Sequence, residues 1–348
     1  MTEFLTVNGR INKMRQIMKE SGVDIYIVPT SDFHMSEYVS PYFQVRKYLS
    51  GFTGSAGTLI ITKETAYLYT DGRYFIQAKD ELKGSEIILM KMGEKGVPTE
   101  EELIDRICEK GFVIGFDGRV ISERYGAKIS RLAANHGSRI KADEDLAVKV
   151  WEDRPELIFN PIYVLEEKYC GESFDSKIAR VREKMKEKQA ETYVLTSLDD
   201  QAWLFNFRGS DIEYNPVFLA YTIVTMDSVI IYTGTDIPDR NQNEKIIRKN
   251  YFEFYEELDK ISGTVMVDLS ETNYLVSEKL KNASIVDAEN PTRIMKAIKN
   301  KTELDNIKKC HVWDGVAVTK YMHWMKKNVG KMHMTEVSAS EYLEQLRK

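Results

Sequence analysis

An internal repeat constrains the fold of this chain more than any other feature. The segment from Ile11 to Asp32 aligns without a gap on the segment from Ile178 to Asp199. The identical pairs are Ile11/Ile178, Arg15/Arg182, Met18/Met185, Lys19/Lys186, Glu20/Glu187, Tyr26/Tyr193 and Asp32/Asp199. Two unrelated helix-then-strand units could resemble one another by chance, but the elements that follow also recur in the same order. We therefore interpret the chain as a duplication of one α/β unit.

Short apolar runs predict equivalent strands in the two halves. TLIIT and AYLYT predict a β-hairpin in the first half, and YTIVT and VIIYT are their counterparts in the second. VIGFD in the first half corresponds to VMVDL in the second. Helical spacing predicts helices over residues 8–21, 74–82, 99–110 and 122–136, the third with a Thr99–Glu102 capping box. The predicted fold class is α/β, with two duplicated domains, each a mixed β-sheet flanked by helices.

The last part of the chain carries a different pattern. From Pro291 onward, apolar residues recur at helical spacing and predict one long helix, and Thr335 caps the start of another. Two amphipathic helices cannot bury both of their apolar faces alone. We therefore expect two domains over residues 1–155 and 156–290, followed by the truncated start of a third over residues 291–348.

Charge and composition argue against several classes of protein. The net charge of −5 disfavours a nucleic-acid-binding protein, and no basic arm stands out. No run approaches the ~20 apolar residues of a membrane span, and the N-terminus lacks the apolar core of a signal peptide. The cysteines (Cys108, Cys170 and Cys310) are odd in number and far apart, which favours free thiols over a disulfide framework. We expect a cytoplasmic protein that binds neither nucleic acid nor membrane.

The stretch from Leu198 to Phe218 is the most site-like part of the sequence. An apolar segment, AWLF, leads directly into charged and amide side chains punctuated by Gly209 and Pro216. The plain interpretation is the capped end of a helix or strand. The alternative is a rigid scaffold that presents a loop to a ligand or to another domain. The counterpart in the first half, residues 48–55, keeps the apolar frame but lacks the polar cluster, and this difference favours a role beyond folding.

Motifs for nucleotide binding and nucleophilic catalysis fail on their context. The glycines of GFTGSAG (residues 51–57) precede a strand, whereas a phosphate-binding loop opens a helix. Ser55 fails as a nucleophile for the same reason. We interpret these glycines as a tight approach of one backbone to another. Asp71-Gly72-Arg73 predicts a turn in which Asp71 binds backbone amides and Arg73 is exposed.

Patterns for metal binding and acid–base catalysis are incomplete. None of the five histidines lies in an HExxH motif or at zinc-ligand spacing with a cysteine. His34 and Glu37 could share one helical face, but two groups do not make a catalytic metal site. Four carboxylates lie near the site-like stretch without a histidine at fixed spacing: Asp199, Asp200, Asp211 and Glu213. By residue chemistry alone, the chain shows no complete active site.

Several longer motifs together resemble one protein family. YLSGFTGSAGTLIIT, AYLYTDGRYFIQAKDEL, LMKMGEKGVPTEEEL, VWEDRPE and AWLFNFRGSDIEYNPVFLAYTIV are similar to the N-terminal half of three-domain Xaa-Pro aminopeptidases (aminopeptidase P), which are creatinase/prolidase-like metallopeptidases. The resemblance covers essentially the whole chain, in order. It implies two creatinase N-terminal-type domains, followed by the first helices of a truncated pita-bread metallopeptidase domain.

The resemblance implies a chemistry that this chain does not complete alone. The family hydrolyses the N-terminal residue from peptides with proline at the second position, and two divalent metals, usually manganese, activate a bridging water. The family's ligands are two Asp, one His and two Glu in the pita-bread sheet, and none can be carried onto a residue here. We therefore expect the chain alone to bind no cofactor or metal and to be inactive. The implied partners of the intact enzyme are proline-containing peptides and, in a homodimer, a second copy.

The resemblance also implies that the second domain adjoins the catalytic one. The site-like loop is then expected to face the substrate or a neighbouring domain, through Arg208, Asp211, Glu213, Tyr214 and Asn215. No residue of the chain is predicted to be catalytic or to bind metal. The alternative is a non-enzymatic module with creatinase-like domains that binds peptides or proteins or drives oligomerisation.

Overall fold

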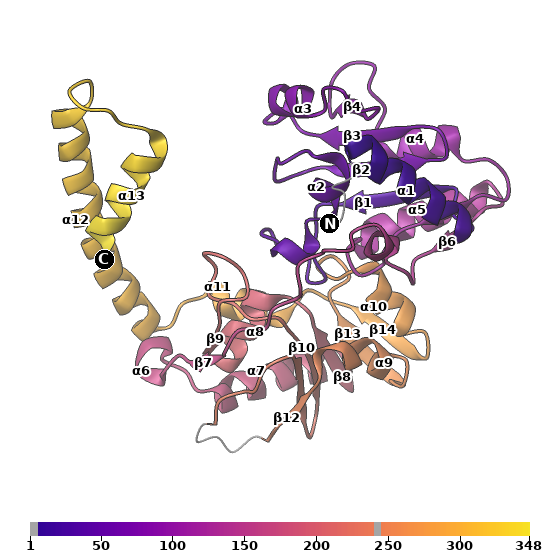
Figure 1. Ribbon diagram of the computed structural model, residues 1–348. Helices are drawn as coiled ribbons and strands as arrows, with labels where there is room; N and C mark the ends of the chain where they lie inside the picture. Colours follow the sequence, from indigo (N-terminus) through magenta and orange to yellow (C-terminus); the bar gives the residue numbers. More distant parts are fainter. Residues whose placement is uncertain (1–5, 240–244) are drawn as a thin grey trace.

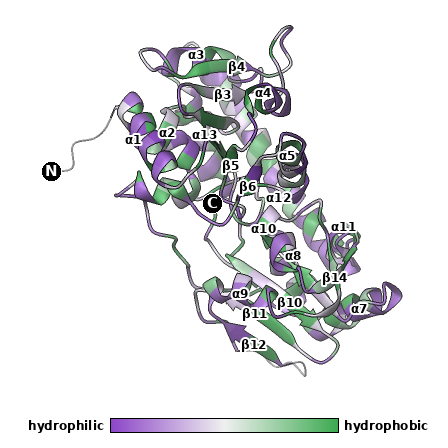
Figure 2. Ribbon diagram, turned by 90° about the vertical axis from the view of Figure 1, so that its right-hand side faces the viewer, coloured by the Kyte–Doolittle hydropathy of each residue, from purple (hydrophilic) through white to green (hydrophobic). Residues whose placement is uncertain are grey.

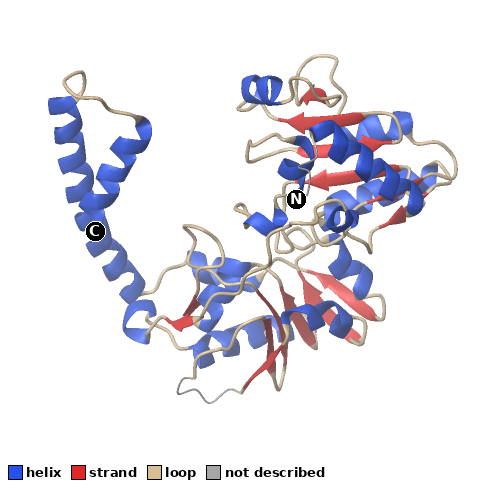
Figure 3. Cartoon of the chain, in the orientation of Figure 1, coloured by secondary structure: helices blue, strands red, loops and turns tan. Residues whose placement is uncertain are grey.

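The computed structural model describes residues 6–239 and 245–348 of the chain. Figures 1 and 3 show two groups of strands, each packed with helices, and a pair of helices that projects away from them without a strand of its own. We call these parts the first unit (residues 6–155), the second unit (residues 156–300) and the helix pair (residues 301–348).

The first unit is built on a six-stranded sheet with the order β4-β3-β2-β1-β5-β6. Strand β2 runs antiparallel to β1 and β3, as the predicted hairpin requires, and the other neighbours are parallel. Its elements are α1 (Val7–Glu20), β1 (Ile25–Pro29), η1 (Pro41–Phe43), α2 (Val45–Ser50), β2 (Thr58–Thr62), β3 (Ala66–Thr70), α3 (Phe75–Glu81), β4 (Ile88–Lys91), α4 (Glu100–Ile107), β5 (Val113–Gly115), α5 (Glu123–Asn135), β6 (Arg139–Lys141) and η2 (Leu146–Lys149). The predicted Thr99–Glu102 capping box at the start of α4 is confirmed.

The second unit has a six-stranded sheet with the order β12-β11-β10-β8-β13-β14. Strand β10 runs antiparallel to β8 and β11, and the other neighbours are parallel, so β8 and β10 stand where β1 and β2 stand in the first sheet. Its elements are β7 (Tyr163–Val164), α6 (Glu167–Cys170), α7 (Phe174–Glu187), β8 (Thr192–Leu195), α8 (Leu198–Phe205), β9 (Phe207–Arg208), β10 (Ala220–Thr225), β11 (Val229–Thr233), β12 (Ile246–Lys249), η3 (Tyr251–Glu253), α9 (Phe254–Leu258), β13 (Gly263–Val267), α10 (Tyr274–Lys279), β14 (Ala283–Asp287) and α11 (Pro291–Ala297). Strands β7 and β9 pair in a small separate sheet.

The central strands of both sheets are buried on both faces. All four residues of β8 and the first four of β1 are buried. In Figure 2 green is common in the central strands, the edge strand β12 carries purple, and the helices carry green and purple residues side by side. Helices cover both faces of each largely parallel sheet. The central strands must therefore be apolar on both faces, whereas each helix needs an apolar surface only on the side that packs against the sheet.

The C-terminal segment corrects one prediction. The pattern from Pro291 onward predicted one long helix, but the chain forms α11 and then α12 (Lys301–Asn328). The break occurs because Asn300 starts a new helix: it forms a capping box with Glu303, and its Nδ2 donates to the Cys170 carbonyl at 2.7 Å. A capping residue that also binds a group outside the helix can thus end one helix and start the next, even where the apolar spacing continues.

The helix pair consists of α12 and α13 (Glu336–Arg347). Thr335 caps α13, as predicted, and the Trp324 and Tyr342 rings stack across the pair with centroids 4.2 Å apart. Much of the apolar surface of α12 lies open, since Val312 is 65 % exposed and Trp313 is 71 % exposed. No helix in the described part of the chain is both long enough and apolar enough to span a membrane.

The two units are docked through α5 and α10. The Tyr274 backbone amide donates to the Ile121 carbonyl at 2.8 Å, and the Leu275 amide donates to the Gly118 carbonyl at 3.0 Å. Gly126 on α5 lies so close to the Tyr274 ring that a Cβ atom there would be 2.3 Å from Cδ2. Backbone bonds and ring packing therefore fix one unit against the other.

His34 joins the units at a second point. Its side chain is buried, with Nδ1 2.7 Å from the Thr196 carbonyl oxygen and Nε2 2.7 Å from the Tyr251 hydroxyl. The suggested helical face shared with Glu37 was wrong, because this segment forms turns and bends. The Asp32 carboxylate holds the turn by accepting from the His34 backbone amide at 2.9 Å, and the ring can then reach partners in the second unit.

We expect acid to weaken the fold through His34. Desolvation lowers the pKa of His34 below its ordinary value, although the Asp32 carboxylate acts in the opposite direction. Below about pH 6.5 the unfolded chain binds a proton at this histidine that the folded chain does not. The free energy of unfolding that neutral His34 contributes is therefore complete above about pH 6.5 and is lost as the pH falls below it. Urea unfolding at several pH values should therefore give a weaker acid dependence for His34→Gln than for the wild type. The exposed His311→Gln variant is the control, and equal acid dependence in all three proteins would contradict the assignment.

Candidate functional site in the loop after α8

The candidate loop begins at Asn206, which ends α8 in a left-handed conformation with φ of 52°. Its side chain is buried, with Oδ1 accepting from Lys177 Nζ at 2.6 Å and Nδ2 donating to the Glu172 carbonyl at 2.8 Å. Lys177 Nζ also donates to the Trp203 carbonyl at 2.8 Å, at the end of α8 where the helix dipole favours a cation. Burial lowers the pKa of Lys177 to about 8. The start of the loop is thus fixed by buried side-chain hydrogen bonds.

Arg208 lies on β9, which pairs with β7. Its Nη1 donates to the Ala202 and Phe207 carbonyls, both at 2.8 Å. Arg208 is half-buried, and this desolvation lowers the pKa of its guanidinium. Arg208 therefore braces the junction between α8 and the loop.

Asp211 closes the loop on itself. Its Oδ1 accepts from the Asn160 backbone amide at 2.6 Å, and its Oδ2 accepts from the Leu219 backbone amide at 2.7 Å. Burial raises the pKa of Asp211, while these backbone donors act to lower it. The carboxylate thus joins the strand that follows the loop to the segment that enters the second unit, and both of its oxygens are used in doing so.

The tip of the loop consists of Glu213, Tyr214 and Asn215. The Asn215 amide donates to the Ile212 carbonyl at 3.2 Å and forms a tight turn. Tyr214 is 98 % exposed and has a φ of 61°, an unfavourable conformation for a large side chain. The Glu213 carboxylate raises the pKa of Tyr214. An ordered loop that holds an aromatic ring fully in solvent is suited to contact a ligand or another domain.

A cleft of ≈ 390 Å³ lies between this tip and the first unit. One wall is Ile212, Glu213 and Tyr214, and the other is made of residues from the segments 30–47 and 53–55. Figure 1 shows the loop after β9 rising from the second unit into the space between the first unit and the helix pair. Arg46 supports the far wall by donating to the Phe52 and Gly54 carbonyls, and burial lowers its pKa to about 10.

The five sequence-predicted residues thus have different positions. Glu213 and Tyr214 line the cleft, whereas Arg208 and Asp211 are occupied in holding the loop, and Asn215 forms its turn. Sequence reasoning missed Lys177 and Arg46. An asparagine directly after an apolar helix is a recognised end signal, and it could have identified Asn206. No motif marks the lysine or the arginine, because Lys177 binds residues of α8 and its C-cap 26 and 29 positions away, and Arg46 binds backbone carbonyls in the turn that follows α2.

The described residues do not fit a two-metal site. Within residues 6–239 and 245–348, no three His, Cys, Asp or Glu side chains come together as metal ligands would. Asp199 and Asp200 pair with Lys296 of α11, the latter at 3.0 Å. These ion pairs secure α11 to α8.

Three other sequence motifs are placed by the structure. Gly57 allows a close backbone approach, because a Cβ atom there would lie 2.6 Å from the Tyr69 carbonyl oxygen. Asp71 accepts from the Arg73 amide at 3.0 Å in a turn, and Arg73 is exposed, so both predictions are confirmed. The cysteines are free thiols.

Two family models describe most of this chain. The Creatinase/Prolidase N-terminal domain is matched twice, by different models, over residues 10–142 and over residues 153–303. The matched ranges correspond closely to the two sheets and their helices. Each unit is therefore a creatinase/prolidase N-terminal domain.

Longer relatives match almost the whole chain. A probable Xaa-Pro aminopeptidase P of Laccaria bicolor is 38 % identical, over 98 % of this chain and 55 % of its own length. The corresponding protein of Coprinopsis cinerea is 35 % identical, over 96 % of this chain and 57 % of its own length. The X-prolyl aminopeptidase of Caenorhabditis elegans, described as a cytosolic enzyme with a di-nuclear active site, is 28 % identical with a TM-score of 0.89, over 98 % of this chain and 60 % of that one. The chain thus spans somewhat more than half the length of these relatives.

Proposed function

We propose that this chain, which carries two creatinase/prolidase N-terminal domains and is homologous to Xaa-Pro aminopeptidases P, supplies the N-terminal domains of such an enzyme. The observation that carries the proposal is the extent of the similarity. One solved X-prolyl aminopeptidase matches 98 % of the chain at a TM-score of 0.89, so the match includes both units and the helix pair. The reaction would be hydrolysis of the N-terminal residue from peptides with proline second.

We further infer that the two units arose by duplication, and that the helix pair begins a pita-bread metallopeptidase domain. The equivalent strand orders of the two sheets support the first inference. The exposed Val312 and Trp313 on α12 support the second, because such an apolar surface suits contact with further protein. In this proposal the two metal ions are manganese, and their ligands lie outside the residues described here.

The loop tip is proposed to contact the peptide or the catalytic domain. Tyr214 and Glu213 lie on the wall of the cleft, and the loop that carries them rises between the first unit and the helix pair. The contacts of Arg208 and Asp211 support a positioning role, since they hold the tip without reaching into the cleft. The chain would in this way contribute to peptide binding, while the bond-breaking groups lie elsewhere.

A joined protein tests the proposed activity. This chain is fused to the portion of the C. elegans enzyme outside the aligned 60 %, and hydrolysis of an Xaa-Pro peptide is assayed with added manganese. We expect release of the N-terminal residue by the fusion, and none by this chain or by the C. elegans portion alone. A folded fusion that binds the peptide without cleaving it would instead favour a non-enzymatic peptide-binding module.

Substitutions in the loop test its role in that protein. We expect Tyr214→Ala to raise the KM or lower the kcat of the fusion with little change in its melting temperature, because the side chain is in solvent. Arg208→Ala should lower activity as well, and it should also lower stability by about 1–2 kcal/mol, because two carbonyl oxygens lose a donor. Tyr38→Ala is the matched aromatic variant, because Tyr38 lies on the opposite wall and is 60 % exposed. It tests whether the whole cleft, and not only the loop tip, contributes to activity. Unchanged activity in Tyr214→Ala would return the loop to a purely structural role.

A further inference from the structure

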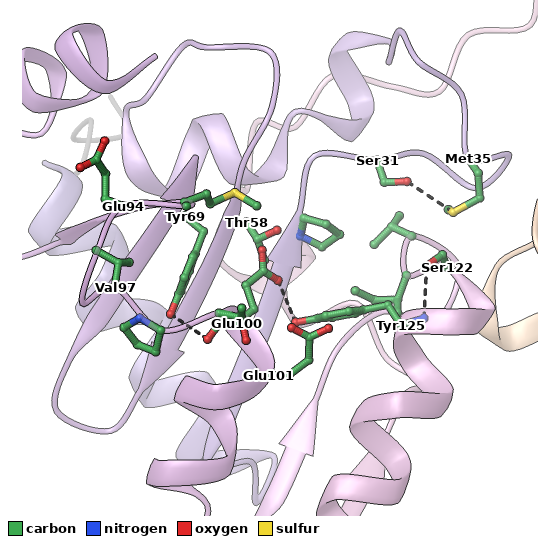
Figure 4. A pocket seen from close by; sticks show the side chains of 17 residues that line it. Ser31, Met35, Thr58, Tyr69, Glu94, Val97, Glu100, Glu101, Ser122 and Tyr125 are labelled. Carbon is green, nitrogen blue, oxygen red and sulfur yellow. Dashed lines mark hydrogen bonds between the residues drawn. The ribbon is translucent and has the colours of Figure 1, made fainter. Parts of the chain in front are cut away.

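A second, larger cavity opens at the carboxyl edge of the first sheet. It has a volume of ≈ 650 Å³ and shares no lining residue with the cleft beside Tyr214. Its floor is formed by Thr58 and Tyr69, which are paired neighbours on β2 and β3. In Figure 4 the Glu100 side chain, from α4, and the Tyr125 side chain, from α5, meet in this space and are joined by a hydrogen bond. The carboxyl edge is where open α/β sheets bind their ligands.

The equivalent place in the second unit is filled by aromatic rings. Counted from the hairpin turns, Tyr221 and Tyr232 hold the positions of Thr58 and Tyr69, and they pair in the same register. The Tyr221 ring stacks on Phe254 with centroids 3.9 Å apart and lies 4.3 Å from the His34 ring. The same architecture can therefore close this edge completely. The cavity in the first unit thus results from its side chains and not from its backbone. The clearest difference is the small Thr58 in the place of a tyrosine.

Glu100 supplies the charge of the cavity. Its Oε2 accepts from the Tyr125 hydroxyl at 2.8 Å, and it also accepts from the Thr58 hydroxyl. Both partners are neutral, whereas the adjacent Glu101 is paired with Lys128 at 3.4 Å. Burial raises the pKa of Glu100. The neutral hydroxyl groups orient this carboxylate but leave its negative charge for a cation.

The rest of the lining suits an apolar body. Pro29, Val97, Val120 and Ile121 line the cavity together with the rings of Tyr69 and Tyr125. Among the lining residues in the described part of the chain there are three glutamates and no lysine, arginine or histidine. A volume of this size is typical of pockets that hold small organic molecules. Aromatic rings beside a carboxylate also favour an organic cation, because the ring faces attract positive charge.

We propose that this cavity binds a small organic ammonium ion, a primary amine on an apolar body. The ammonium group would pair with Glu100, and the apolar body would lie between Tyr69, Tyr125 and Ile121. This site is separate from the cleft beside Tyr214, because it lies in the first unit and shares no lining residue with that cleft.

Three probes of one shape test the proposal on the full chain. Phenethylamine, 2-phenylethanol and 3-phenylpropionate carry a cation, a neutral hydroxyl and an anion on similar bodies. Titration calorimetry should show binding of the amine, with the alcohol weaker by about 10- to 100-fold and the acid not binding. Amide NMR signals of Thr58 and Tyr125 should shift with the amine. No binding of the amine at about 10 mM, or equal binding of the acid, would overturn the proposal.

Two substitutions separate the charge from the space. Glu100→Gln keeps an acceptor for Tyr125 and should weaken amine binding by about 10- to 100-fold while leaving alcohol binding unchanged. Thr58→Tyr copies Tyr221 of the second unit, fills the cavity and should abolish binding of both probes. Glu64→Gln, exposed in the turn between β2 and β3, is the matched control and should bind the amine as the wild type does. Equal amine affinity in Glu100→Gln and the wild type would overturn the assignment, whether or not Thr58→Tyr folds.

Discussion

Replacing Asn206 by alanine is expected to lower the free energy of unfolding by about 3–5 kcal/mol. Two hydrogen bonds are lost, and the new residue must hold a strained backbone conformation. The Lys177 ammonium loses an acceptor at 2.6 Å, and the Glu172 carbonyl loses a donor at 2.8 Å. Lys177 is only 1 % exposed, so water cannot replace that acceptor. Alanine must also hold a φ of 52°, which asparagine tolerates better.

A glycine at the same position separates these contributions. Asn206→Gly loses both hydrogen bonds but relieves the left-handed backbone, so it should be about 1 kcal/mol more stable than Asn206→Ala. Urea unfolding followed by tryptophan fluorescence measures both, since Trp203 lies on Lys177 with its ring centroid 4.1 Å from Nζ. Asn12→Ala, on the exposed face of α1, is the control and should stay within about 0.5 kcal/mol of the wild type. A loss below about 1 kcal/mol in Asn206→Ala would show that the buried contacts contribute little.

The same substitution should release the loop. Asn206 is followed directly by Phe207 and Arg208, whose strand pairing and carbonyl contacts depend on where α8 ends. Limited proteolysis under native conditions should therefore cut Asn206→Ala within residues 209–216 sooner than it cuts the wild type. Equal cutting would mean that the contacts of Arg208 and Asp211 hold the loop without Asn206.

Local patterns in the sequence predicted most of the strands and helices correctly. The spacing of Ile11, Met14, Ile17 and Met18 predicts α1, and all four side chains are buried in the structure. The turn residues between TLIIT and AYLYT predict the hairpin of β2 and β3, which forms in that register. These predictions succeed because helix caps, hairpin turns and one-sided apolar patterns depend on residues a few positions apart.

The two failures combine local and distant contacts. The break before α12 follows from the capping box of Asn300, which also meets the distant Cys170 carbonyl. The turn at His34 is held locally by Asp32, and the His34 ring reaches partners in the second unit. A periodic apolar pattern shows none of these contacts, so periodicity extended one helix too far and suggested another where none forms.

The candidate loop and the cavity differ in how far the sequence reveals them. The polar residues after AWLF indicated the loop, yet their separate roles followed only from their contacts, as with Arg208 and Asp211. The cavity left no signal in any motif. It exists because Thr58 is small where its counterpart Tyr221 is large, and this comparison requires the strand register of both sheets.

Replacing Gly126 by alanine is expected to lower the free energy of unfolding by about 2–3 kcal/mol and to loosen the docking of the two units. A Cβ atom at this position would lie 2.3 Å, 2.6 Å and 2.9 Å from Cδ2, Cγ and Cβ of Tyr274. A change of rotamer can move the ring but not the Tyr274 Cβ, which is fixed to the backbone of α10. The helices α5 and α10 must therefore separate, and the bonds from Tyr274 and Leu275 to the first unit must lengthen.

A double-mutant cycle with Tyr274→Gly, which removes both the ring and its Cβ, distinguishes this clash from an effect on the helix itself. Once both are removed, Gly126→Ala should no longer destabilise the protein, and it should stabilise α5 by up to about 1 kcal/mol, because alanine is the better helix former. Gly315→Ala is the matched control, since this glycine lies within α12 and a Cβ atom there would meet nothing within 4 Å. It should be neutral or stabilising in both backgrounds. Equal destabilisation by Gly126→Ala with and without the Tyr274 ring would contradict the steric explanation, because a helix-propensity or backbone effect does not depend on a side chain of the other unit.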